Sequence, residues 1–91
     1  MKICVLDGEK ITDKEALHST LAECLGFPDW YGRNLDALYD CLTGMGENVE
    51  IRLRQTAALK QNLGGYAENL LRMLRDAAEE NEKILVSINE K

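Results

Sequence analysis

Two carboxylates and a tyrosine fall at helical spacing near the middle of the chain. Asp36, Tyr39, Asp40 and Thr43 occupy positions i, i+3, i+4 and i+7, so a helix places all four on one exposed strip. Asp36 lies in the first turn, where the helix dipole favours a carboxylate, but Asp40 lies nearer the negative end and repels Asp36. A charge that local rules disfavour indicates either a solvated face or a surface that binds a cationic partner.

Aromatic residues precede this strip. Phe27, Trp30 and Tyr31 are three of the five aromatic side chains, and they lie in a short loop before Asn34, which can cap a helix over residues 35–43. A ring such as Trp30 or Tyr31 projecting beside unpaired carboxylates has the composition of a protein-interaction hot spot. Composition alone favours such a surface no more than an ordinary solvated face.

A second pair of acids lies further along the chain. Asp76 and Glu80 are four residues apart in a long helical pattern, and Arg72 offers Asp76 an internal ion pair from four residues before it. Taken alone, these two acids are better explained as a solvated helix face.

No arrangement of residues indicates an enzyme. The sequence contains no glycine-rich phosphate loop, no nucleophile elbow and no paired histidines on a helix. Asp36 and Asp40 could hold Mg²⁺ for a metal-assisted hydrolase, but an exposed helix face lacks the enclosed pocket that catalysis needs. His18 has no nucleophile motif beside it, and we expect it at the surface or at the boundary of the core. We predict no catalytic activity, no metal and no cofactor.

The cysteines indicate the compartment. Cys4, Cys24 and Cys41 show none of the close pairing typical of zinc or redox sites. We expect all three to be reduced and buried as small apolar residues, in a protein of the cytoplasm. No apolar run reaches the length of a membrane span, and the N-terminal residues are too polar for a signal peptide.

The charge balance restricts the class of partner. The 91 residues carry 16 Asp or Glu and 11 Lys or Arg, for a formal net charge of −5. Such a balance argues against nucleic acid and anionic membranes as direct partners and leaves a basic partner possible. Residues 29–50 hold five acids and one arginine, so most of the net charge lies on the aromatic loop, the following helix and the residues after it.

The elements that must position these residues alternate between strands and helices. Apolar patterns predict strands over residues 1–6, 49–54 and 84–88, and helices over residues 13–25, 35–43 and 56–63. After a break at Gly64-Gly65, a long amphipathic helix is predicted from the apolar pattern that begins at Ala67, ending near Glu80. Thr12 and Glu15 form a capping box for the first helix. The unbroken apolar run of the first strand predicts a central strand buried on both faces, and the alternation of the second predicts an edge strand. The pattern predicts one α/β domain over residues 1–91, a three-stranded parallel sheet flanked by about four helices.

At residues 28–44 the sequence PDWYGRNLDALYDCLTG resembles the signature of the barstar family, small intracellular inhibitors of secreted guanyl-specific ribonucleases such as barnase. The resemblance extends from Asp7-Gly8-Glu9 through Leu17-His18 to Arg75-Asp76-Ala77 and Glu80. It implies a three-stranded parallel sheet flanked by helices, and a non-enzymatic protein that plugs the active site of a small basic ribonuclease. We expect such a protein to be cytoplasmic and monomeric when free.

The resemblance also implies roles for individual residues. Asp40 matches the carboxylate that occupies the phosphate pocket of the ribonuclease, and Asp36 matches a neighbouring contact. Trp30 stands where the family has an aromatic residue that packs on the catalytic loop of the enzyme. Glu80 matches a more peripheral position. The residues expected to bind the partner are Trp30, Asn34, Asp36, Tyr39, Asp40, Thr43 and Asp76.

Two positions depart from the family pattern. Arg33 replaces an acid that is usual in the closest relatives, and Met45-Gly46 replaces a larger turn that contains an aromatic residue. Because both lie on the implied binding face, the cognate enzyme could differ from barnase. The alternative is a barstar-like binding module for another basic protein or a toxin domain.

Overall fold

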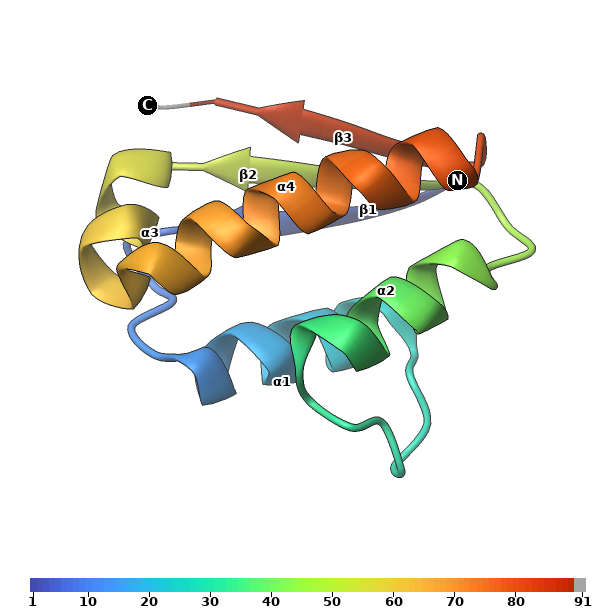
Figure 1. Ribbon diagram of the computed structural model, residues 1–91, viewed down its shortest axis with the longest axis horizontal. Coiled ribbons are helices and arrows are strands. Elements are labelled where there is room, and N and C mark those ends of the chain that lie inside the picture. The colour runs from blue at the N-terminus through green and yellow to red at the C-terminus, as the bar shows by residue number, and fades with distance from the viewer. Residues whose placement is uncertain (90–91) are drawn as a thin grey trace.

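The computed structural model describes residues 1–89, which form a three-stranded parallel sheet and four helices (Figure 1). The elements follow in the order β1 (Lys2–Asp7), α1 (Lys14–Leu25), α2 (Leu35–Thr43), β2 (Val49–Arg54), α3 (Thr56–Leu63), α4 (Gly65–Glu80) and β3 (Ile84–Ile88). The predicted α/β class, the parallel sheet and the four helices are confirmed.

The order of strands in the sheet differs from the prediction. The order is β1-β2-β3, so β2 is central and β1 lies at an edge, and the expectation for both strands is wrong. In β1, Ile3 and Val5 are 48% and 43% exposed while Cys4 and Leu6 are fully buried. Alternate residues of β2 are buried in the same way. The helices therefore cover one face of the sheet, and the alternation in β2 reflects the bare opposite face and not an edge position.

Aliphatic side chains from the sheet and all four helices fill the space between the two layers. Burying one such side chain contributes about 1.5–3 kcal/mol, so this core holds the helices against the sheet. The largest of these fully buried side chains are Leu6, Leu17, Leu21, Leu38, Leu42, Ile51, Leu53, Leu59, Leu70, Leu74 and Ile84. Helices α2 and α4 also pack against each other (Figure 1).

The starts of α1 and α2 are determined by side-chain caps. Asn34 caps α2 as predicted, because its Oδ1 accepts a hydrogen bond from the Ala37 amide at 2.7 Å. In α1 the cap is Asp13, whose Oδ1 accepts from the Ala16 amide at 2.7 Å, so the capping box predicted from Thr12 is wrong by one residue. Thr12 and Asp13 are adjacent and either can cap a helix; the capping-box pattern with Glu15 favoured Thr12, whereas aspartate is the stronger capping residue.

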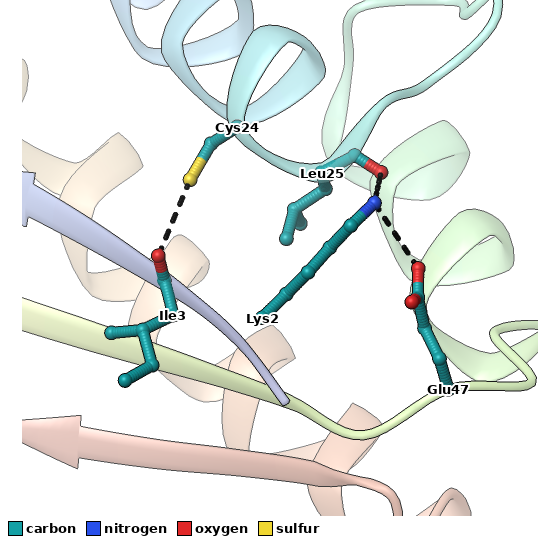
Figure 2. A network of polar contacts seen from close by, with 5 residues as sticks. All are labelled: Lys2, Ile3, Cys24, Leu25 and Glu47. Atoms are coloured by element: carbon teal, nitrogen blue, oxygen red, sulfur yellow. Dashed lines mark hydrogen bonds and ion pairs between the residues drawn. The ribbon is translucent and has the colours of Figure 1, made fainter.

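Figure 2 shows how the start of β1 is attached to α1 and to the segment after α2. Lys2 Nζ donates a hydrogen bond to the Leu25 carbonyl oxygen at 3.4 Å and forms an ion pair with Glu47 at 3.1 Å. A cation at the last carbonyls of a helix interacts favourably with its dipole. On the same side, Cys24 Sγ lies 3.9 Å from the Ile3 carbonyl oxygen, so α1 runs beside β1.

This contact between α1 and β1 changes the interpretation of the cysteines. Cys4 and Cys24 form a disulfide with their Cα atoms 5.8 Å apart, and Cys41 is free. The expectation that all three are reduced is therefore wrong for Cys4 and Cys24. The two are 20 positions apart in the sequence, and only the packing of α1 on β1 brings them together.

Candidate functional site

A groove of about 540 Å³ lies between α2 and α4. Three carboxylates and one guanidinium line it, so its charged groups sum to a negative value. We refer to it as the acidic groove, and its lining residues are Leu35, Asp36, Tyr39, Asp40, Asn69, Arg72, Met73 and Asp76.

The carboxylates of the acidic groove form no ion pair within residues 1–89. In the part of the chain that the structure describes, ion pairs join Lys2 to Glu47 and Arg52 to Glu50, and neither pair reaches the groove. Asp36, Asp40 and Asp76 are all exposed. Three carboxylates on two packed helices outnumber the single Arg72 guanidinium beside them and form no ion pair with it, so the groove keeps a net negative charge that can attract a cationic group.

Tyr39 lies at the centre of this negative field. Its side chain is half-buried between α2 and α4, and this burial raises the pKa of its hydroxyl. The carboxylates of Glu80, Asp76 and Asp40 raise the Tyr39 pKa further, because they disfavour a phenolate between them. Glu80, which the sequence leaves as a peripheral position, is thus close enough to contribute to the potential at Tyr39.

The aromatic loop presents one ring to solvent. Trp30 is 83% exposed, while Tyr31 is buried and packs on Phe27 with ring centroids 4.8 Å apart. Trp30 is therefore available to a partner and Tyr31 is not. Trp30 does not line the acidic groove.

His18 is buried, and the expectation of a surface or boundary histidine is wrong. It is 1% exposed, and its Nδ1 and Nε2 lie 2.7 Å from the hydroxyl oxygens of Tyr31 and Tyr66. A neutral imidazole has one donor and one acceptor nitrogen, so one tyrosine hydroxyl donates to His18 and the other accepts from it. Burial lowers the pKa of His18, and the nearby Arg33 guanidinium lowers it further. The side chain therefore joins α1 to the aromatic loop and to α4.

Arg33 lies in the aromatic loop, and its side chain contacts α1 and not the acidic groove. Its guanidinium donates to the Glu15 carbonyl oxygen at 3.2 Å and to the Ser19 hydroxyl, both on α1. The residue has a φ of 55°, a left-handed conformation that non-glycine residues adopt at some energetic cost. These two hydrogen bonds hold the loop against α1.

Two of the residues predicted to bind a partner are engaged within α2. Asn34 caps the helix, and its Nδ2 also donates to the Gly32 carbonyl oxygen at 3.3 Å. Thr43 Oγ1 donates to the Tyr39 carbonyl oxygen at 2.9 Å. Neither side chain lines the acidic groove.

Four of the seven predicted residues meet in the acidic groove: Asp36, Tyr39, Asp40 and Asp76. The sequence interpretation missed the α4 residues Asn69, Arg72 and Met73. Their spacing carried a usable signal, because Asn69, Met73, Asp76 and Glu80 fall at i, i+4, i+7 and i+11, which is one face of a helix.

Asn81 determines how α2 lies against α4, and nothing in its sequence context indicates this role. It follows α4 directly, and its Nδ2 donates to the carbonyl oxygens of Leu42 and Met45 at 3.0 Å each. Leu42 lies in the last turn of α2 and Met45 follows the helix, where carbonyl oxygens lack the amide donors of a further helical turn. Asn81 therefore attaches both walls of the acidic groove to each other.

Over residues 1–89 no helix combines the length and apolar character of a membrane span. The same residues contain no cluster of three or more His, Cys, Asp or Glu side chains that could hold a metal ion.

Comparison with known proteins identifies relatives of the chain. Residues 1–89 match the model of a protein family described as Barstar (barnase inhibitor). A protein of Bacillus subtilis (strain 168), named "Putative ribonuclease inhibitor YrdF", is 41% identical over 81 residues, which cover 88% of this chain and 89% of that protein.

Proposed function

The chain belongs to the barstar family, and on this premise we propose that it inhibits a small basic ribonuclease by occupying the enzyme's active site. The acidic groove and the exposed Trp30 form the binding surface in this proposal. The observation that carries it is the set of three unpaired carboxylates on α2 and α4. The proposed inhibitor has no enzymatic activity of its own and is monomeric when free. Its action in the cytoplasm is proposed from the barstar family resemblance alone, because the Cys4–Cys24 disulfide removes the argument from reduced cysteines.

The chemistry of the target explains why such a surface would inhibit it. A ribonuclease holds RNA phosphates with Arg, Lys and His side chains, and these groups also bind carboxylates through charge-assisted hydrogen bonds. Asp36, Asp40 and Asp76 would replace phosphate charges, and Trp30, exposed on the loop before α2, would add apolar contact outside the groove. Because two packed helices hold the carboxylates in place, binding would require little further ordering of the inhibitor.

Opposite charges on the two surfaces would also make binding fast. Complementary potentials steer the two proteins during encounter, and ion pairs that lose their water at the centre of the interface slow dissociation. Association should therefore slow as salt concentration rises.

A cleavage assay tests the proposal. Adding this protein to a small secreted guanyl-specific ribonuclease from the same organism should abolish RNA cleavage at a 1:1 ratio. Undiminished cleavage in the presence of excess protein would refute the proposed function.

The central and peripheral acids should differ in their effect. Asp40→Ala removes a groove carboxylate and should weaken inhibition on the order of 30-fold or more, the usual cost of losing a hot-spot side chain. Glu80→Ala removes a carboxylate that does not line the groove and should weaken inhibition by less. Inhibition constants from titration measure both variants, and equal losses would contradict this ranking.

The alternative partner, another basic protein or a toxin domain, rested partly on Arg33. Its guanidinium binds α1 and not the acidic groove, so this substitution gives little reason to expect a different partner. Identification of a non-ribonuclease basic protein in a pull-down from the native cell would favour the alternative.

A further inference from the structure

A second, smaller depression of about 290 Å³ lies next to the acidic groove and has the opposite charge. Three cations and one acid line it, on a chain whose formal net charge is −5. Its lining residues are Lys60, Glu68, Leu71, Arg72 and Arg75. We refer to Lys60 of α3 with Arg72 and Arg75 of α4 as the basic flank.

The cations of the basic flank are available to an external partner. Lys60, Arg72 and Arg75 are all exposed, and none has an ion pair within the part of the chain that the structure describes. Glu68 and Asp76 each stand four residues from Arg72 on α4, yet neither approaches it closely enough to form an ion pair. An exposed guanidinium without an internal partner can bind a carboxylate through two parallel hydrogen bonds.

The basic flank is continuous with the acidic groove. Arg72 lines both depressions, so the surface over α4 changes from negative beside α2 to positive beside α3. Helix α3 lies at the start of α4, and α2 lies along its later turns (Figure 1). A partner that covers the acidic groove would therefore reach the basic flank without any change in the fold.

The positive charge of the basic flank is unexpected on a protein proposed to bind a basic ribonuclease. If the partner is a basic protein, cations on the inhibitor would oppose association unless each faces an anion. We propose that Lys60, Arg72 and Arg75 bind carboxylates of the same ribonuclease, at the edge of the basic cleft that receives the acidic groove. This inference rests on the proposed function. It names a property of the partner, since ribonucleases without acids at that edge would be bound more weakly.

The Kd for the ribonuclease tests this inference. If the arginines bind carboxylates of the ribonuclease, removing them raises Kd, and if they only repel a basic partner, removing them lowers Kd. The double variant Arg72→Gln, Arg75→Gln should bind the ribonuclease more weakly, by roughly two- to fivefold in Kd for each arginine, as expected for exposed charge pairs. Arg54→Gln is the matched control, because Arg54 is exposed on the bare face of the sheet and has no ion pair in residues 1–89. The control should leave Kd unchanged or slightly lower it by removing a general repulsion.

Unchanged, faster or tighter binding by the double variant would refute the proposal that the basic flank binds carboxylates of the ribonuclease. Thermal unfolding of each variant checks that an altered Kd does not come from an altered fold. A wild-type protein that fails to inhibit the ribonuclease would overturn the proposed function, and the flank with it. Full inhibition by the wild type, with equal Kd values for the double variant and the control, would refute the role of the basic flank and leave the proposed function intact.

Discussion

The stability of this protein should fall as the pH falls through the ordinary titration range of histidine. His18 is the only histidine of the chain, and in the folded state it lies buried between Tyr31 and Tyr66. Protonation would leave both ring nitrogens as donors and would place a charge in the core near the Arg33 guanidinium. Burial and Arg33 therefore lower the folded-state pKa of His18, and the unfolded state binds a proton more readily.

The sign and size of the effect follow from this difference. Below the unfolded pKa of about 6.5 the unfolded chain takes up one proton that the folded chain does not, which costs about 1.4 kcal/mol of unfolding free energy per pH unit. The loss ends once the pH falls below the lowered pKa of the folded state. If folded His18 stays neutral throughout, moving from pH 7.5 to pH 5.5 removes about 1.4 kcal/mol.

Urea unfolding of the wild type and of His18→Gln across this pH range measures the effect. Glutamine can still donate and accept a hydrogen bond but does not titrate, so the difference between the two proteins cancels the contribution of the carboxylates. We expect the wild type to lose stability relative to the variant as pH falls. The reasoning would be refuted if the difference in unfolding free energy between the two proteins stayed constant with pH, or if acidification made the wild type more stable relative to the variant.

Two substitutions separate stability from binding. Asn81→Ala removes the hydrogen bonds to the Leu42 and Met45 carbonyls, so the unfolding free energy in urea should fall by about 1–3 kcal/mol and the inhibition constant should rise. Stability equal to that of the wild type would show that Asn81 does not attach α2 to α4. Trp30→Ala truncates a side chain that is 83% exposed, so unfolding free energy should change by less than about 0.5 kcal/mol while ribonuclease inhibition weakens. Inhibition that survives this change intact would exclude Trp30 from the binding surface.

The helices were predictable because their signals are local. Helix α2 begins after its N-cap Asn34 and ends at its C-cap Gly44, and Leu38 and Leu42 lie on its buried face. The two ends of this helix therefore follow from a few neighbouring residues. The choice between Thr12 and Asp13 as the cap of α1 was not predictable, because two local rules favour different residues.

Strand order was not predictable from the same kind of signal. An apolar run such as that of β1 indicates burial on both faces only if helices cover both faces of the sheet. Here they cover one face, so Ile3 and Val5 face solvent and β2 occupies the centre. The layer arrangement is a property of the whole chain, and no window of a few residues contains it.

Part of the candidate site was also predictable from local sequence, and part was not. The spacing of Asp36, Tyr39 and Asp40 placed them on one helix face, and the resemblance to the barstar family added Asp76. The sequence by itself therefore determined the charge, the helices and the family of this protein. Only the tertiary structure joined α2 to α4 through Asn81, buried His18 between two tyrosines, and paired Cys4 with Cys24. These contacts link residues that are 13 to 48 positions apart, and their formation depends on how the helices pack on the sheet.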